Sequence, residues 1–406
     1  MKAITKYKYN NKFHTTLINV VYQFKCNKNE IMALTILSKL LSKTNKKYND
    51  EGSFVKERLN RYIINYSVLN QNINNITFIN FSLLIPNDNV IKEYNLNKSI
   101  TFLLDTIYNH NLNDDLLFEK EKKLYLEYLL NSYKSIDFIA EKNMLDLIDS
   151  EGDFSTLKYK DIKNINDLTK NDVINVYNKY ILNIKPKIFV NGNHNIDKLN
   201  NVFDKYFNKY DLKNNTIIKK YDNYYKCNEL KEKIDSSKFY QSIVYLVYSV
   251  KDYSEKDYYK LLLLDLLLSS STSDLLLKNL RKKSNLVYTS SSNILMNNGL
   301  LFIKAMTNKV NIKLVKLIIF EIIKDLNKVK KYSKHIENII NNYELNIKRE
   351  QDNFYVISNN VINKYYKTDL TSKEELEELK NITLDEFKEF ISRLVLTCEY
   401  TLEGEL

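Results

Sequence analysis

Arg281 and Tyr288 are the residues whose types and spacing most suggest a chemical role. They lie seven positions apart, where a helical pattern of leucines gives way to an alternating, strand-like pattern. A guanidinium and a phenol are both hydrogen-bond donors with defined geometry, so each can hold an acceptor in a fixed orientation. The alternative interpretation is that Arg281 is a solvated helix arginine and Tyr288 an ordinary strand tyrosine, one of 32 in the chain.

The other polar residues match no established catalytic pattern. Serines are abundant at 269–273 and 290–292, but neither a Gly-x-Ser-x-Gly motif nor a suitably placed histidine accompanies them. The sequence also lacks a phosphate-binding loop and a dinucleotide fingerprint, and its 5 glycines leave little room for either. The four histidines have no metal-ligand spacing, and we interpret them as ordinary surface or capping residues: His14, His110, His194 and His335. On its own, this polypeptide is expected to catalyse no reaction.

A helix, a turn, a second helix and a strand should position the Arg281–Tyr288 pair. Leu261–Leu268 is too rich in leucine and too poor in β-branched residues for a strand, which favours a buried helix. The polar segment Ser269–Ser273 ends this helix. Asp274–Lys283 then places its leucines on one helical face, and Leu286–Tyr288 alternates into serines as a strand would.

The string LSSSTSDLLLKNLRKKSNLVY resembles the second-half signature of the pitrilysin-type zinc metallopeptidases, the inverzincins, in the branch of the processing peptidases. The paired glycines of that signature are Ser269 and Ser270 here, and its earlier arginine is Leu275. In the family, the last arginine and tyrosine hold the peptide and stabilise the transition state at a zinc site in another domain. The resemblance implies this role for Arg281 and Tyr288.

The same resemblance shows what the first half lacks. An inverzincin carries His-x-x-Glu-His on its first helix, with a second glutamate downstream as the third zinc ligand. Aligning the Gly-Thr that follows the motif with Lys43-Thr44 places the motif positions at Leu34, Leu37 and Ser38, which cannot bind zinc or act as a base. The distal ligand position corresponds to Glu127, and a single glutamate does not hold zinc. We therefore expect no metal in this chain.

The order of predicted elements occurs twice along the chain. The strands at 15–24 and 76–85 correspond to those at 243–250 and 300–306. The helix at 169–180 begins with Thr-x-x-Asp, and its counterpart at 383–394 begins with the capping box Thr-x-x-Glu. Such self-similarity indicates an internal duplication.

The predicted fold is α+β, with two homologous domains that each pack helices on one face of a mixed, mostly antiparallel sheet. The resemblance implies the same arrangement. We predict a first domain at 1–207, a linker at 208–237, which is charged and lacks a clear period, and a second domain at 238–406 that carries the Arg/Tyr pair.

Composition excludes several classes of protein. The net charge of +11 is spread along the chain, so we expect a lysine-rich solvated surface and no nucleic-acid binding. No stretch of 18 apolar residues and no apolar signal core occurs, which predicts a cytoplasmic protein that does not bind a membrane. The three cysteines are far apart and fit a reducing compartment: Cys26, Cys227 and Cys398. The basic residues form one local cluster: Lys328, Lys330, Lys331 and Lys334.

These observations lead to one functional hypothesis and one alternative. The first is a zinc-less subunit of a heterodimeric metallopeptidase, which encloses and processes peptides with a homologous, zinc-bearing partner and donates Arg281 and Tyr288 to the partner's site. By analogy with small bacterial members of the family, the substrates would include leader or bacteriocin-type peptides. The alternative is a non-enzymatic scaffold or peptide-binding protein with a degenerate peptidase fold.

Overall fold

The structure is a computed structural model. It describes residues 3–62, 64–87, 90–91, 95–149, 151–152, 162–227, 229–270, 274–282, 284–368 and 370–405. Of the predicted elements, Ser271–Ser273 in the turn and Lys283 at the end of the second helix lie outside these residues. The chain divides into two compact units. Unit 1 comprises Met1–Asn131, Tyr159–Tyr221 and Asn353–Asp369, and unit 2 comprises Ser132–Lys158, Asp222–Asp352 and Leu370–Leu406.

Unit 1 contains a five-stranded sheet with the order β1-β5-β2-β4-β3. The edge pair β1/β5 is parallel and the other pairs are antiparallel. Its strands are β1 (Ile4–Tyr9), β2 (Thr15–Lys25), β3 (Asn65–Ile73), β4 (Ile76–Pro86) and β5 (Lys187–Gly192).

Unit 2 repeats this topology strand for strand, with the order β6-β10-β7-β9-β8 and a parallel edge pair β6/β10. Its strands are β6 (Lys231–Ser236), β7 (Ser242–Val250), β8 (Val287–Leu295), β9 (Leu300–Thr307) and β10 (Leu394–Glu403). The identical order confirms the predicted α+β class and the duplication. Strand β6 lies inside 208–237, the segment that we interpreted as a linker.

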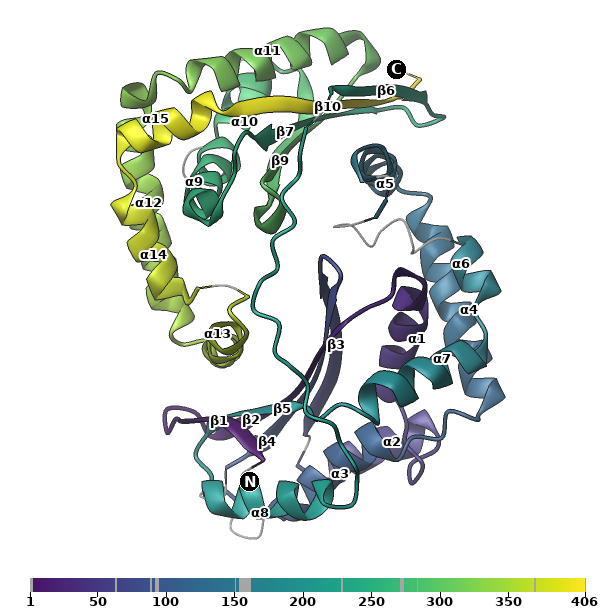
Figure 1. Ribbon diagram of the computed structural model, residues 1–406. Coiled ribbons are helices and arrows are strands. Elements are labelled where there is room, and N and C mark those ends of the chain that lie inside the picture. The colour runs from purple at the N-terminus through teal and green to yellow at the C-terminus, as the bar shows by residue number, and fades with distance from the viewer. Residues whose placement is uncertain are drawn as a thin grey trace. The chain divides into compact units, whose positions relative to one another are not determined.

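Most helices of each unit pack on one face of its sheet, the main face, either directly or through another helix (Figure 1). In unit 1 these helices are α1 (Ile31–Leu41), α2 (Glu51–Asn60), α3 (Leu96–Tyr108), α4 (Asp115–Ser132), α6 (Ile162–Asp167), α7 (Lys170–Val176), which continues as a π-helical turn (Tyr177–Ile181), and α8 (Ile196–Phe207). In unit 2 they are α9 (Tyr258–Ser269), α10 (Leu275–Leu277) with the π-helical turn η5 (Lys278–Lys282), α11 (Ile312–Asp325), α12 (Ser333–Glu350), α14 (Ser372–Asn381) and α15 (Leu384–Ser392). Both predicted N-terminal caps form, at Thr169 and at Thr383.

A single helix covers the opposite face of each sheet, and it comes from a distant part of the sequence. In unit 1, α13 (Phe354–Tyr366) packs against residues of β2, β4 and β5. In unit 2, α5 (Ile136–Ile148) packs against β7, β9 and β10, on the side away from α11 (Figure 1). Both faces of the central strands are therefore buried, which explains why β7 has no exposed residue.

The connection between β8 and β9 depends on one glycine. Gly299 has φ of +69°, and a Cβ atom at this position would come within 2.6 Å of the Tyr253 ring. The left-handed conformation and the close aromatic contact both favour glycine. This turn aligns β8 as the edge strand of the unit 2 sheet.

Candidate functional site

The three positions of the predicted zinc motif lie on α1 and are buried in the core of unit 1. Leu34 and Leu37 are 1% and 0% exposed and pack within the hydrophobic cluster under the sheet. Ser38 donates its hydroxyl proton to the carbonyl oxygen of Leu34 at 2.9 Å, one turn back in the same helix. Because the apolar side chains fill this face and the only hydroxyl is engaged, the three positions do not fit a zinc ion.

An ion pair and a cation–π contact connect α1 to α4. Lys43 Nζ lies 2.8 Å from Glu121 Oε1, whose side chain is 2% exposed. Lys39 Nζ lies 5.2 Å from the centroid of the Tyr125 ring. Burial raises the pKa of Tyr125 to about 12, so the ring stays neutral under the ammonium group. Two lysines of α1 and its C-terminal turn therefore meet the helix that would supply the distal zinc ligand.

Glu127, the predicted distal position, lies on α4 and is exposed. Leu34, Leu37 and Ser38 are buried, so the structure does not assemble Glu127 with them into a ligand set. Across the described part of the chain, no group of three or more His, Cys, Asp or Glu side chains could hold a metal ion.

Arg281 lies in the π-helical turn η5, on the exposed side of a segment anchored by Leu280. Its carbonyl oxygen accepts a hydrogen bond from the Asn285 amide at 2.8 Å, which closes the turn before β8. Asn285 has a positive φ of 49°, a conformation that asparagine tolerates better than most residues. The turn therefore presents the guanidinium to solvent from a defined backbone position.

Tyr288 is 45% exposed and lies at an irregularity of the β8/β9 ladder. Val287 pairs with Thr307 and Thr289 with Met306, so Tyr288 is the extra residue of a bulge. Bulges redirect a side chain out of the regular alternation of a strand. The Tyr288 hydroxyl donates to Asn308 Oδ1 at 2.8 Å. Among the described residues, no hydrogen bond or ion pair joins Tyr288 to Arg281.

One serine from each cluster, Ser269 and Ser292, forms a structural contact. Ser292 donates its hydroxyl proton to Asp265 Oδ1 at 2.5 Å and lies 2.8 Å from the Ser269 hydroxyl, which connects β8 to α9. Burial raises the pKa of Asp265, and the hydrogen bond from Ser292 opposes this effect. Because Ser292 donates its proton to a carboxylate with no imidazole between them, it does not form a Ser-His-Asp triad.

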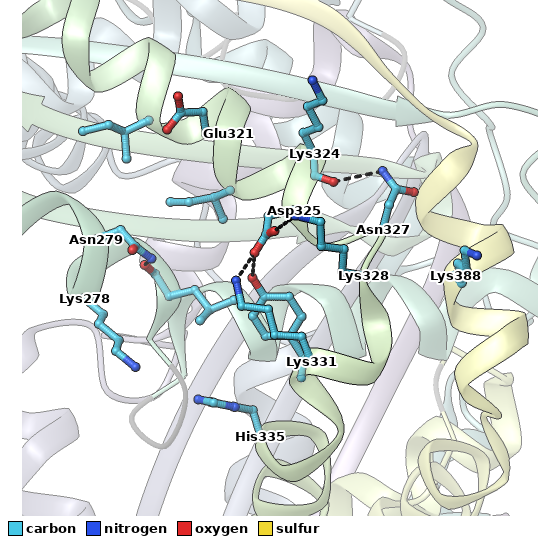
Figure 2. A pocket seen from close by; sticks show the side chains of 14 residues that line it. Lys278, Asn279, Glu321, Lys324, Asp325, Asn327, Lys328, Lys331, His335 and Lys388 are labelled. Carbon is cyan, nitrogen blue, oxygen red and sulfur yellow. Dashed lines mark hydrogen bonds and ion pairs between the residues drawn. The ribbon is translucent and has the colours of Figure 1, made fainter.

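A cavity in unit 2 contains charged residues that sequence analysis did not bring together. Asp325 lies 3.0 Å from Lys328 Nζ, accepts a hydrogen bond from the Tyr332 hydroxyl at 2.6 Å and pairs with Lys331 (Figure 2). Hydrogen bonds from Lys331, Tyr332 and Lys328 hold the pKa of Asp325 well below its ordinary value. The lysine cluster in the sequence contained part of this site, but Lys278 and Lys388 join it only through the tertiary fold.

Comparisons with known proteins relate the chain to one family of peptidases. A family model described as the peptidase M16 inactive domain matches residues 167–343. No curated protein matches the sequence. In the described part of the chain, no helix is both long and apolar enough to cross a membrane.

Several solved structures share the whole fold. A conserved protein from Enterococcus faecalis V583 superposes with a TM-score of 0.86 and 20% identity, over 98% of this chain and 96% of that chain. A peptidase M16 inactive domain from Pseudomonas fluorescens gives a TM-score of 0.77 and 10% identity, over 98% and 95% of the two chains. The periplasmic protease PqqL from Escherichia coli gives 0.72 and 12%, over 98% of this chain but 44% of that longer chain.

Proposed function

We propose that this chain is a zinc-less, non-catalytic subunit of a heterodimeric metallopeptidase of the M16, or pitrilysin-type, family, to which the matched domain and the shared fold relate it. A homologous partner would hold the zinc ion and activate the water. One observation carries the proposal: the positions of α1 that the resemblance assigns to the metal motif are two leucines and a serine, all buried, whereas Arg281 and Tyr288 are exposed in the other unit.

One longer relative has room for a second pair of units of this size, although a protease from Helicobacter pylori matches this chain over 95% of its own length. The protein covers 44% of the PqqL chain, so a polypeptide of that length contains about twice the material present here. In our proposal, the second half is a separate polypeptide with an intact His-x-x-Glu-His helix. The partner binds the metal and this chain contributes donors to the same substrate.

Arg281 and Tyr288 would act on the peptide carbonyl as negative charge develops. A guanidinium and a phenol hydroxyl aimed at such an oxygen stabilise the transition state, and loss of one donor costs on the order of 3 kcal/mol in enzyme sites. The Tyr288 hydroxyl, which donates a hydrogen bond to Asn308 in this structure, would donate it to the substrate oxygen instead.

Strand β8 offers a way to hold the peptide. It is the edge strand of the unit 2 sheet, and its outer edge pairs with no other strand among the described residues. An extended peptide can add to such an edge through main-chain hydrogen bonds. A peptide added along β8 would pass Tyr288, which lies at the first bulge of that strand.

We further propose that the pair works in the cytoplasm on leader or bacteriocin-type peptides. Support for a reducing compartment comes from the cysteines: all three are free thiols, and Cys398 is buried. The peptide class rests on analogy with small bacterial members of the family.

Reconstitution with the partner tests the proposal. The chain and a homologue that retains His-x-x-Glu-His are purified separately and mixed, and cleavage of a peptide library is followed by mass spectrometry. The mixture should cleave peptides that neither chain cleaves alone. Arg281→Ala should lower kcat by about 100-fold without changing the elution volume of the pair.

Lys282→Ala is the matched control, because Lys282 is an exposed cation in the same turn. It should leave kcat within about twofold of the unsubstituted pair. If the partner cleaves equally well with and without this chain, the proposal is wrong.

The alternative, a scaffold or peptide-binding protein, is favoured by the Tyr288–Asn308 hydrogen bond, which already satisfies the phenol. In that case the chain would bind peptides, and Arg281→Ala and Tyr288→Phe would leave every cleavage rate unchanged.

A further inference from the structure

The cavity in unit 2 has the size of a small-molecule site. Its volume is about 860 Å³, within the range of ligand pockets in proteins. The π-helical turn η5, helix α11, the start of α12 and helix α15 each contribute lining residues (Figure 2). Arg281 and Tyr288 do not line it. The cavity is therefore separate from the residues assigned to peptide cleavage.

Positive charge exceeds negative charge around this cavity. The lining lysines outnumber the two carboxylates, Glu321 and Asp325, by three. Asp325 pairs with two of these lysines, Lys328 and Lys331. The remaining three have no ion-pair partner among the described residues: Lys278, Lys324 and Lys388. Ammonium groups brought together from separate elements repel one another, so binding an anion between them relieves that repulsion.

The cavity also has an apolar wall and an unsatisfied polar atom. Leu275, Ile318 and Ile322 contribute apolar side chains between the charged residues. His335 also lines the cavity, and its Nδ1 atom is buried with no hydrogen-bond partner among the described residues. A buried polar atom of this kind normally has a partner, so the imidazole has capacity to bind a ligand.

We propose that this cavity binds an organic phosphate of nucleotide size, with the phosphate groups beside Lys278 and His335, which lie toward the same end of the cavity in Figure 2, and the organic part against the apolar wall. Lysine is an established phosphate binder that acts as a point charge, and the three hydrogens of its ammonium group can donate to a tetrahedral group from several directions. All the charged nitrogen donors that line the described cavity belong to lysines.

Calorimetric titration of the full chain with ADP and with inorganic pyrophosphate tests the proposal at one fixed salt concentration. ADP should bind saturably at one site. ADP should bind about tenfold more tightly than pyrophosphate, because only ADP can bury an organic part against Leu275, Ile318 and Ile322.

Two charge-matched double variants identify the site. Lys278→Ala/Lys388→Ala should weaken ADP binding by about tenfold or more. Lys330→Ala/Lys334→Ala removes the same charge from exposed residues of the same region that do not line the cavity, and should weaken binding by less than about twofold. His335→Phe keeps a ring beside Tyr332 and should weaken binding by about threefold or more, because only the nitrogen atoms are lost.

Any of four results would overturn the proposal: no saturable binding of ADP, equal losses in the two double variants, pyrophosphate binding as tightly as ADP, or an acidic peptide such as hexaglutamate binding this cavity more tightly than either. Each readout is independent of peptide cleavage, so the outcome is separate from that of the reconstitution.

Discussion

Helix α1 in unit 1 and the η5–β8 segment in unit 2 are the two regions to which the resemblance to the inverzincins assigns site residues, and they differ in where their side chains lie. On α1, the motif positions are two leucines and a serine that are all buried, and the helix is fixed by packing and by Lys43–Glu121. On η5–β8, Arg281 and Tyr288 are exposed and make few contacts. Substitutions should therefore affect stability in the first region, and function in the second.

The largest change in the free energy of unfolding should come from a substitution on the buried face of α1. Leu37→Ala removes a side chain that is 0% exposed. It should lower the free energy of unfolding by roughly 2–5 kcal/mol, because it leaves a cavity in the core. Urea denaturation followed by circular dichroism measures the change. Leu116→Ala on α4, at 86% exposed, is the control and should change it by less than about 0.5 kcal/mol. Equal effects would show that α1 is not a core helix.

Breaking the ion pair beside α1 should have the next largest effect. Lys43→Met leaves the buried Glu121 carboxylate without its cation and should cost about 3 kcal/mol of unfolding free energy. Lys43→Met/Glu121→Leu should recover most of this loss, since two apolar side chains replace the pair. As a control, Lys120→Met, on α4 like Glu121, breaks an exposed ion pair with Glu51 of α2. It should cost less than about 1 kcal/mol of unfolding free energy. A double variant as unstable as Lys43→Met would show that the loss does not come from an unpaired Glu121 carboxylate.

The pH dependence of stability tests whether burial keeps His110, which contacts the C-terminal end of α1, in its neutral form. His110 Nε2 lies 3.2 Å from the Leu40 carbonyl oxygen, and burial lowers the pKa of His110 from 6.5 to about 4. The folded protein therefore binds fewer protons than the unfolded chain between these values, so stability falls as pH decreases from about 6.5 towards 4. At pH 5 the loss from this histidine should be roughly 2 kcal/mol relative to pH 8.

Carboxylates also contribute to acid unfolding, so the informative quantity is the difference between the wild-type protein and His110→Gln. The difference between the unfolding free energies of the two proteins should change by roughly 2 kcal/mol between pH 8 and pH 5. Parallel pH profiles would show that the imidazole is not held neutral by burial.

The smallest effects are expected in the η5–β8 region. Arg281→Ala removes an exposed side chain and should change the unfolding free energy by less than about 0.5 kcal/mol. Tyr288→Phe removes one partly exposed hydrogen bond and should cost about 0.5–1 kcal/mol. Thermal unfolding of both variants measures these changes. A loss above about 2 kcal/mol would mean that this region is structural, and the contrast with α1 would disappear.

Sequence patterns predicted the central strands because these have the strongest periodicity. The apolar residues of β2 and β4 place side chains on both faces of a buried sheet, and the equivalent pattern in β7 and β9 revealed the duplication. Strand β10 was missed although LVLTCEYTLE contains β-branched and aromatic residues. Strands β1 and β6 were missed because ITKYKY and KEKIDS are short and charged. Such composition is common at sheet edges, where charges discourage pairing with other chains, and it resembles that of a loop.

The candidate sites were predictable only where they are local in sequence. Leu34, Leu37 and Ser38 follow from motif spacing on one helix, and Arg281 and Tyr288 from one continuous string. The cavity around Asp325 was not predictable in the same way, because Lys278 and Lys388 are more than a hundred positions apart. Likewise, no local feature of the sequences of α5 and α13 shows which sheet each helix covers.

The exchange of these two helices between units has a consequence for synthesis on the ribosome. The face of the unit 1 sheet formed by Val21, Phe78 and Phe189 is covered by α13, which begins at Phe354. Until most of the polypeptide has emerged, this apolar face lacks its covering helix, although Tyr221 packs against Phe78. Contacts so distant in sequence also slow folding, since a long loop must close before they form. The nascent chain therefore passes through a long interval in which an aromatic surface is open to chaperones and to aggregation.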